Sequence, residues 1–366
     1  MLVKDITATI EEEAPALYQE SYDNAGIQVG NPEAEVTAVL LSLDVTEAVL
    51  EEAMQRGCNM IVCHHPVIFS GIKKLMGRNY VERIVLKAIK NDITIYTAHT
   101  NLDNMYHGVN AKIAEKLGLK DIRILEPKSN ILSKLYTYAP LHVADKVRDA
   151  LFAAGAGQVG NYKESSFNAR GVGTFKPGAN TNPAIGQANG AREDVEEVKI
   201  EVLVEKHNEG NVLRALFENH IYEEVAYELI PLSNSNQQIG AGMVGTLPVA
   251  MDEADFLAVV KKQMRAECIR HTVLKGKKVE KVAFCGGSGS FLLPHAIRAK
   301  ADIFITGDYK YHQFFDAEEK IIIADIGHYE SEQYTPEIFE TILKRKFPTF
   351  AILLSNINTN PVKYFY

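Results

Sequence analysis

Two adjacent histidines end an apolar run at residues 61–66, which reads Ile-Val-Cys-His-His-Pro. Imidazole nitrogens bind divalent metal ions, and open α/β sheets place their ligand sites at the carboxyl ends of their strands. His64 and His65 are therefore candidate metal ligands. Because an isolated histidine pair also fits an ordinary polar loop, the assignment depends on further ligands elsewhere in the chain.

Three more candidate ligands follow other predicted strands. Asp103 ends the segment His-Thr-Asn-Leu-Asp that comes after an expected strand at residues 93–98. His328 and Glu332 are four residues apart, so a helix that begins near residue 327 places them on one face. Together with the histidine pair, these residues predict a metal centre built from two distant halves of the chain.

The number of candidate ligands favours two metal ions. Five side chains exceed the three that an open catalytic zinc site uses beside water, whereas two ions bridged by Asp103 use all five. Adjacent strand residues face opposite ways, so His64 and His65 either serve different ions or diverge in the loop. Histidine and carboxylate ligands suit zinc, our first choice, and also iron, manganese, cobalt or nickel.

Other polar loops leave alternatives open. Asp308 and His312 either support the metal ligands and transfer protons near them, or Asp308 caps the following helix. His99 either takes part in the chemistry or only hydrogen-bonds in its loop. Residues 286–290, Gly-Gly-Ser-Gly-Ser, either cradle a phosphate through backbone amides or form a tight turn, since the loop lacks the Lys-Ser/Thr of a P-loop. Cys63 is expected in the core.

Composition predicts a soluble, reduced cytoplasmic protein. Of 366 residues, 46% are hydrophobic and 23% are charged, and no apolar run approaches the ~18 residues of a membrane span. No signal peptide is visible, and the four cysteines have no CxxC spacing. The net charge of −8, spread without a basic block, counts against nucleic acid as a partner but not against a nucleotide-sized substrate.

The elements that must position the ligands alternate between strand and helix. This order predicts an α/β fold with a largely parallel, helix-covered sheet. In the first part we expect helices at 2–17, 47–56, 80–90 and 109–117, and strands at 36–43, 61–65 and 93–98. In the last part we expect extended chain at 239–247, helices at 253–265 and 291–300, and strands at 279–285, 301–306 and 320–324.

The middle of the chain has a different pattern, β-α-β-β-α-β, which is the ferredoxin-like order. Its expected elements are 135–138, 142–154, 166–175, 198–205, 208–219 and 226–230, with a mobile loop at 176–192. The segments on both sides of it resemble linkers, which predicts that this segment is a compact domain inserted into a loop of the α/β domain. We therefore divide the chain into a first α/β half at 1–126, an inserted α+β domain at 127–236 and a second α/β half at 237–366.

The motifs resemble those of the Nif-three-like family, whose bacterial members carry the label GTP cyclohydrolase I type 2 homolog. The resemblance rests on Cys-His-His-Pro at 63–66, His-Thr-Asn-Leu-Asp at 99–103, Gly-Gly-Ser-Gly at 286–289, Thr-Gly-Asp at 306–308 and Gly-His-Tyr-Glu-Ser-Glu at 327–332. Asp-Asn-Ala-Gly at 23–26 is also similar to the family's amino-terminal signature, although Tyr22 stands where a tryptophan is common.

The resemblance implies a specific architecture. It implies the Nif-three-like α/β fold in two halves, interrupted by a domain similar to the PII and CutA proteins, and a toroidal homohexamer around an internal cavity. It also implies a dinuclear metal site whose ligands are those that the spacing predicts: His64, His65, Asp103, His328 and Glu332.

Two classes of function follow from these observations. The first is a metal-dependent hydrolase of a nucleotide or another phosphorylated small molecule, with GTP ring opening as the leading case and phosphoester cleavage as the next. In it, His99 or Glu330 shuttles protons to and from a metal-activated water. The second is a non-enzymatic metal-binding chaperone, or a hexameric scaffold whose inserted domain senses a ligand.

Overall fold

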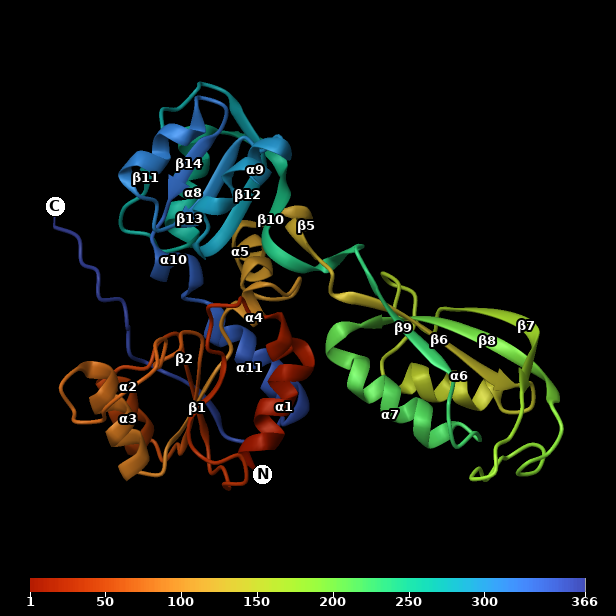
Figure 1. The fold of residues 1–366 in the computed structure, drawn as a ribbon. Coiled ribbons are helices and arrows are strands. Elements are labelled where there is room, and N and C mark those ends of the chain that lie inside the picture. The colour runs from red at the N-terminus through yellow and green to blue at the C-terminus, as the bar shows by residue number, and fades with distance from the viewer. Residues whose placement is uncertain (366) are drawn as a thin grey trace. The chain divides into compact units, whose positions relative to one another are not determined.

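The computed structural model describes residues 1–365, and the chain divides into two compact units. Unit 1 comprises Met1–Pro127 and Gln238–Tyr366, and unit 2 comprises Lys128–Gln237 (Figure 1). Unit 1 contains a five-stranded and a six-stranded sheet, and unit 2 contains a four-stranded sheet. The α/β fold expected from the alternating elements is confirmed.

The first sheet of unit 1 has the strand order β1-β4-β3-β2-β15. The strands are β1 (Gly26–Val29), β2 (Val39–Ser42), β3 (Met60–Cys63), β4 (Thr94–Thr97) and β15 (Ile352–Leu354). All neighbours are parallel except β1, which is antiparallel to β4. Apolar residues cover both faces, with α1 (Val3–Glu13) and α11 (Thr335–Lys346) on one and α2 (Glu47–Gln55) and α3 (Tyr80–Lys90) on the other.

The second sheet of unit 1 has the order β11-β14-β13-β12-β10-β5. Its strands are β5 (Lys120–Ser129), β10 (Ser235–Asp252), β11 (Arg270–His271), β12 (Lys278–Ser288), β13 (Ile303–Gly307) and β14 (Ile322–Asp325). The central strands β12, β13 and β14 are parallel. Helices α5 (Val109–Leu117) and α8 (Glu253–Gln263) pack on one face, and α9 (Leu293–Arg298) with the 3-10 helix η4 (Tyr311–Ala317) packs on the other.

Unit 2 has the expected β-α-β-β-α-β order in an antiparallel sheet. Its elements are β6 (Leu132–Pro140), α6 (Ala144–Ala153), β7 (Ser166–Phe175), β8 (Glu193–Glu205), the 3-10 helix η2 (Lys206–Asn208), α7 (Glu209–Asn219) and β9 (Tyr227–Leu232). The strand order is β7-β8-β6-β9, and α6 and α7 lie along one face (Figure 1). The likeness to PII and CutA proteins stays a prediction.

Several expected boundaries were wrong for identifiable reasons. The first helix ends at Glu13 rather than near residue 17, because the residue before Pro15 is disfavoured in helical geometry. Strand β12 extends through Ser288 into the expected glycine loop. Strands β1, β5, β11 and β15 were not predicted. All four lie at sheet edges, where burial is less complete and the apolar pattern in the sequence is weaker. Among the described residues, no helix has the length and apolar character that a membrane crossing needs.

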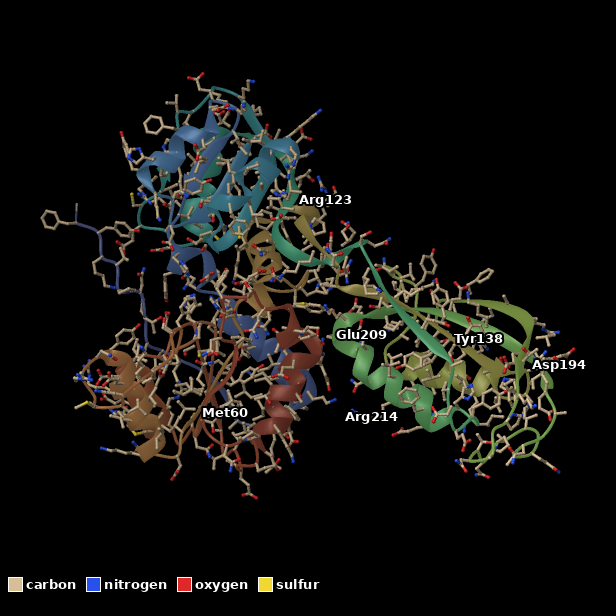
Figure 2. The ribbon with its side chains drawn as sticks, in the orientation of Figure 1. Met60, Arg123, Tyr138, Asp194, Glu209 and Arg214 are labelled. Carbon is tan, nitrogen blue, oxygen red and sulfur yellow. The ribbon has the colours of Figure 1, made fainter. Side chains whose placement is uncertain are left out.

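One apolar cluster joins the carboxyl-terminal part of unit 1 to its first sheet. Phe339 of α11 is fully buried against residues of α1 and β2, in the same cluster as Met60, which is labelled in Figure 2. Helix α11 begins three residues after Glu332, so its packing sets the position of that carboxylate.

We expect Phe339→Ala to lower the free energy of unfolding by about 3–5 kcal/mol, because it leaves a cavity in this cluster. Chemical denaturation with a helix signal measures the loss. Tyr311→Ala, at a side chain that is 71% exposed, is the control and should change the free energy by less than about 0.5 kcal/mol. A loss below 1 kcal/mol for Phe339→Ala would contradict the assigned packing.

Candidate metal centre

The ends of parallel strands from both sheets of unit 1 meet at one site. His64 and His65 follow β3, and the short helix α4 (Thr100–Asp103) follows β4. From the second sheet, β14 leads through residues 326 and 327 into α10 (His328–Glu332). All five predicted ligands therefore lie just beyond carboxyl ends of strands, where the parallel arrangement leaves a crevice.

The backbone after β3 separates the two adjacent histidines. The amides of His64 and His65 both donate to the carbonyl of Leu43, each at 3.0 Å, which closes a tight turn beside β2. The ring centroids lie 4.9 Å apart. His64 is fully buried, whereas the side chain of His65 is 22% exposed, so the two imidazoles reach different parts of the site.

Four imidazoles are held in the same way. Each uses Nδ1 to donate to an oxygen atom: His64 to the carbonyl of Ala98 (2.9 Å), His65 to Asp44 Oδ1 (2.7 Å), His99 to Asp23 Oδ1 (2.7 Å) and His328 to Asp308 Oδ2 (2.7 Å). A carbonyl or a carboxylate only accepts, so the proton is on Nδ1 and Nε2 carries the lone pair in the neutral ring. Such partners are typical of histidines that bind metal ions.

The Nε2 atoms converge on the carboxylate of Glu332. Its Oε2 lies 2.9 Å from Nε2 of His65 and 3.0 Å from Nε2 of His328, and those two nitrogens are 3.2 Å apart. Lone pairs brought this close repel one another unless a proton or a metal ion lies between them. The arrangement therefore requires positive charge at its centre.

Two buried atoms on the other side of Glu332 have unused coordinating capacity. Nε2 of His64 and Oδ1 of Asp103 are 3.4 Å apart and make no hydrogen bond with any residue in the described range 1–365. Glu332 Oε1 is 3.8 Å from the same imidazole nitrogen. A buried acceptor without a partner is costly in free energy. A metal ion bound by these atoms removes that cost, so the residues fit a metal site.

The potential ligands form overlapping groups, each of which can hold a metal ion. There are three such sets, and within each set the coordinating atoms lie within 4.8 Å of one another. The sets are His65, His328 and Glu332; His64, Asp103 and Glu332; and His64, His65 and His99. Glu332 belongs to two sets, whereas Asp103 belongs to one. Sequence analysis favours Asp103 as a bridging carboxylate, and in the structure Glu332 is the carboxylate that lies close to imidazole nitrogens of both sets.

Close backbone packing holds Glu332 in this position. Gly287 adopts a φ of +60°, and a Cβ at this position would lie 2.4 Å from Glu332 Oε1. Its amide donates to Ser331 Oγ, and the amides of Gly286 and Gly289 donate to side chains of Asn110 and Thr306. These donors are already used, so the loop serves packing rather than a phosphate cradle.

The carboxylates shift the pKa values of the imidazoles strongly. The charge of Glu332 raises the pKa of His328 to about 11, with a further contribution from Asp308. Burial lowers the pKa of His65, but hydrogen bonds with Asp44 and Glu332 outweigh burial and raise it to about 10. Burial and the charge of Glu332 raise the pKa of Asp103 to about 8. Without a metal ion, the site therefore retains protons at neutral pH.

The remaining candidates are divided between the site and its surroundings. His99 lies in one ligand group, and Asp308 supports His328, as one of the alternatives foresaw. Glu330 is in no ligand group of the described residues, and its Oε1 accepts from Asn360 Nδ2 at 3.0 Å. His312 packs against Tyr311 on η4.

Cys63 is a core residue, as expected. Its thiol donates to the carbonyl of Tyr96, and burial raises its pKa to about 12. Cys63 is in none of the ligand groups found among residues 1–365.

Sequence analysis missed two supporting carboxylates. Asp44 and Asp23 orient His65 and His99, and Asp23 also accepts from the amide of Thr100. Asp44 directly follows a predicted strand, which is the same signal that identified the ligands. Asp23 lies in a turn-rich segment, where nothing in the spacing separates a supporting residue from a turn residue.

A cavity of about 460 Å³ opens beside His65 and His328. Glu330, Tyr329 and Asn360 also line it, and among its lining residues in the described range Arg270 is the one Lys or Arg. The guanidinium donates to the carbonyl of Tyr309 and to Asp325, and its side chain is 57% exposed. The volume lies within the range of small-molecule sites.

Comparisons with known proteins find similarity over nearly the whole chain. A family model described as Duf34/NIF3 (NGG1p interacting factor 3) matches residues 1–361. A GTP cyclohydrolase 1 type 2 homolog of Halalkalibacterium halodurans is 40% identical over 347 residues, which are 93% of each chain. A protein of the same name from Bacillus subtilis is 35% identical over 99% of this chain and 98% of its own. The crystal structure of a Bacillus cereus protein related to NIF3 is similar with a TM-score of 0.88 and 35% identity, covering 100% of this chain and 99% of that one.

We expect metal binding to release protons and to strengthen as the pH rises. The raised pKa values of His65 and His328 mean that both rings are protonated at neutral pH, and a metal ion must displace these protons. Affinity should rise about tenfold per pH unit for each proton released, until the pH approaches about 10. Calorimetry with Mn²⁺ between pH 6 and 8, in buffers of different ionisation enthalpy, counts the protons. Binding without proton release would contradict this electrostatic description.

We expect Asp44→Ala to weaken metal affinity by about 10- to 100-fold, because His65 loses the acceptor that fixes its orientation. The measurement is competition with a chelating dye. Glu47→Ala, three residues further on at an exposed carboxylate paired with Arg83, is the matched control and should leave affinity unchanged. Equal effects of both variants would show that Asp44 acts only through overall charge.

Proposed function

Because this chain belongs to the Duf34/NIF3 family, we propose that it is a hydrolase that uses two divalent metal ions and acts on a nucleotide or another phosphorylated small molecule. The observation that carries the proposal is the position of Glu332, whose two carboxylate oxygens face two different sets of potential ligands. One carboxylate shared in this way is the usual bridge of a two-metal site.

The ligand sets support a division of the residues between two ions. His65 and His328 would hold one ion, His64 and Asp103 would hold the other, and Glu332 would bridge them. Zinc is the first choice and iron, manganese, cobalt and nickel are alternatives, since imidazole and carboxylate ligands suit all of them. Bound divalent ions supply Lewis acidity and lower the pKa of water toward neutrality.

His99 is placed to move a proton. Its Nδ1 donates to Asp23, so Nε2 is the atom that faces the ligand groups and can accept a proton. Burial opposes the charge of Asp23, but hydrogen bonds with His99 and Thr100 keep the pKa of Asp23 low, so this carboxylate stays an acceptor that fixes the orientation of the His99 ring. Glu330 lines the adjacent cavity and is the second candidate for proton transfer.

The cavity next to His328 offers aromatic surface and amide groups through Tyr329 and Asn360. Arg270 is paired with Asp325, and the carboxylates of Asp44, Asp308 and Glu330 also line the cavity. An anionic group of a substrate would therefore depend on bound metal ions for its charge compensation. The names of the relatives favour GTP ring opening at the purine C8 as the first reaction to test, followed by phosphoester cleavage. The toroidal homohexamer implied by the resemblance is part of the same proposal.

Metal content tests the proposal directly. We expect about two ions per chain in the untagged protein purified without chelator, about one in His328→Ala or Asp103→Ala, and almost none in Glu332→Ala. Elemental analysis measures the content, and Glu340→Ala, at a partly exposed carboxylate of α11 that pairs with Lys344, is the control. Equal loss in all three ligand variants, or no loss in any, would contradict the two-ion assignment.

Turnover separates the hydrolase from the alternative. Metal-loaded wild-type protein should hydrolyse GTP or a phosphoester, and Asp103→Ala should lose at least about 100-fold in rate while remaining folded. If the loaded protein shows no turnover but transfers its metal to an apo-acceptor protein, the metal-chaperone function is supported instead.

A further inference from the structure

Unit 2 contains a cavity of about 660 Å³ that the proposed hydrolase does not use. It lies on the sheet face opposite α6 and α7. On β8, the buried residues Ile200 and Val202 pack against the helices, and Glu197 and Lys199 alternate with them on the other face. The strand register places Gly171 and Ala169 of β7 opposite these two residues, and all four line the cavity.

One carboxylate of this cavity has a free oxygen. Glu197 is only 8% exposed, and its Oε1 accepts from the hydroxyl of Tyr222 at 2.8 Å. Across residues 1–365, no protein donor reaches Oε2 of this carboxylate, and this oxygen is not fully enclosed by protein atoms. Because Glu197 lines the cavity, Oε2 can accept a hydrogen bond from a ligand that carries a donor.

Gly173 leaves room for that oxygen. A Cβ built at this position would lie 2.0 Å from Glu197 Oε2, so any other residue would displace the carboxylate. The glycine therefore keeps the unpaired oxygen at the surface of the cavity.

Aromatic rings form the walls. Tyr138 of β6, labelled in Figure 2, lines the cavity together with Phe175 and Tyr222, whose ring centroids are 5.9 Å apart at an interplanar angle of 63°. Flat aromatic surfaces beside a hydrogen-bond acceptor favour a planar, nitrogen-containing ring.

The charges that line the cavity balance one another. Arg170, Lys176 and Lys199 are matched by the carboxylates Glu197, Glu223 and Glu224. The ammonium group of Lys199 is engaged, since it lies 2.9 Å from Glu201 and 4.2 Å from the ring centroid of Tyr136. The lining therefore has no net positive charge that would select a phosphate group.

We propose that this cavity binds an aminopurine-sized heterocycle, whose N–H group donates to Glu197 Oε2 and whose ring packs against Tyr138, Phe175 and Tyr222. The volume falls within the range of small-molecule sites. This site lies wholly within unit 2 and does not depend on the metal centre or on the proposed hydrolase.

The fluorescent nucleoside 2-aminopurine riboside is a suitable probe, because it carries an exocyclic N–H donor and the chain contains no tryptophan. Titration of the full-length protein should give saturable quenching as the base stacks on the aromatic walls. Guanosine should displace the probe, whereas caffeine, a purine that lacks every N–H donor, should not.

Matched variants locate the site. Glu197→Gln keeps the size of the side chain and an acceptor for Tyr222 but removes the charge, and we expect at least tenfold weaker binding with an unchanged melting temperature. Gly173→Ala should weaken binding similarly. Glu196→Gln, at the exposed neighbour on the opposite face of β8, and His328→Ala in unit 1 should leave probe binding unchanged.

Three results would overturn the proposal. They are the absence of saturable quenching at millimolar probe, unchanged binding in Glu197→Gln, and loss of binding in His328→Ala, which would place the probe at the metal centre.

Discussion

A single buried carboxylate, Glu332, organises the candidate site. It is 3% exposed, and imidazole nitrogens from both halves of unit 1 face its two oxygens. Burial alone would raise its pKa, but His328 and its neighbours hold that pKa well below the usual range. A charge buried this deeply is tolerated only when it is fully compensated. The surrounding structure is arranged to provide that compensation.

The groups that compensate the charge of Glu332 are themselves held by a second set of groups. Strands β3 and β14 present imidazoles at their carboxyl ends, and Asp44 and Asp308 fix the rings from behind. The strands themselves are buried between helices on both faces, so the loops that follow them are short and well anchored. Rigid strands carrying ligands on short loops are what a preorganised metal site requires.

Much of this was predictable from sequence, because strand ends and helical spacing follow simple geometry. The i, i+4 relation of His328 and Glu332 places both in α10, as expected. Spacing favoured Asp103 as the bridging carboxylate, whereas the geometry supports the proposal of Glu332, because spacing does not show which of two acidic residues lies between the imidazoles. Similarly, the Gly286–Ser290 segment was open to two interpretations until its amides were seen to bind side chains within the fold. Asp23 acts across a distance of 76 residues, which no local pattern reveals.

The most direct test of the shared role of Glu332 is an anomalous-scattering experiment on crystals of the metal-loaded protein, with data collected on either side of the metal absorption edge. The account predicts two anomalous peaks per chain on opposite sides of Glu332, one beside His65 and His328 and the other beside His64 and Asp103. A single peak, or peaks that leave Glu332 uncoordinated, would contradict it.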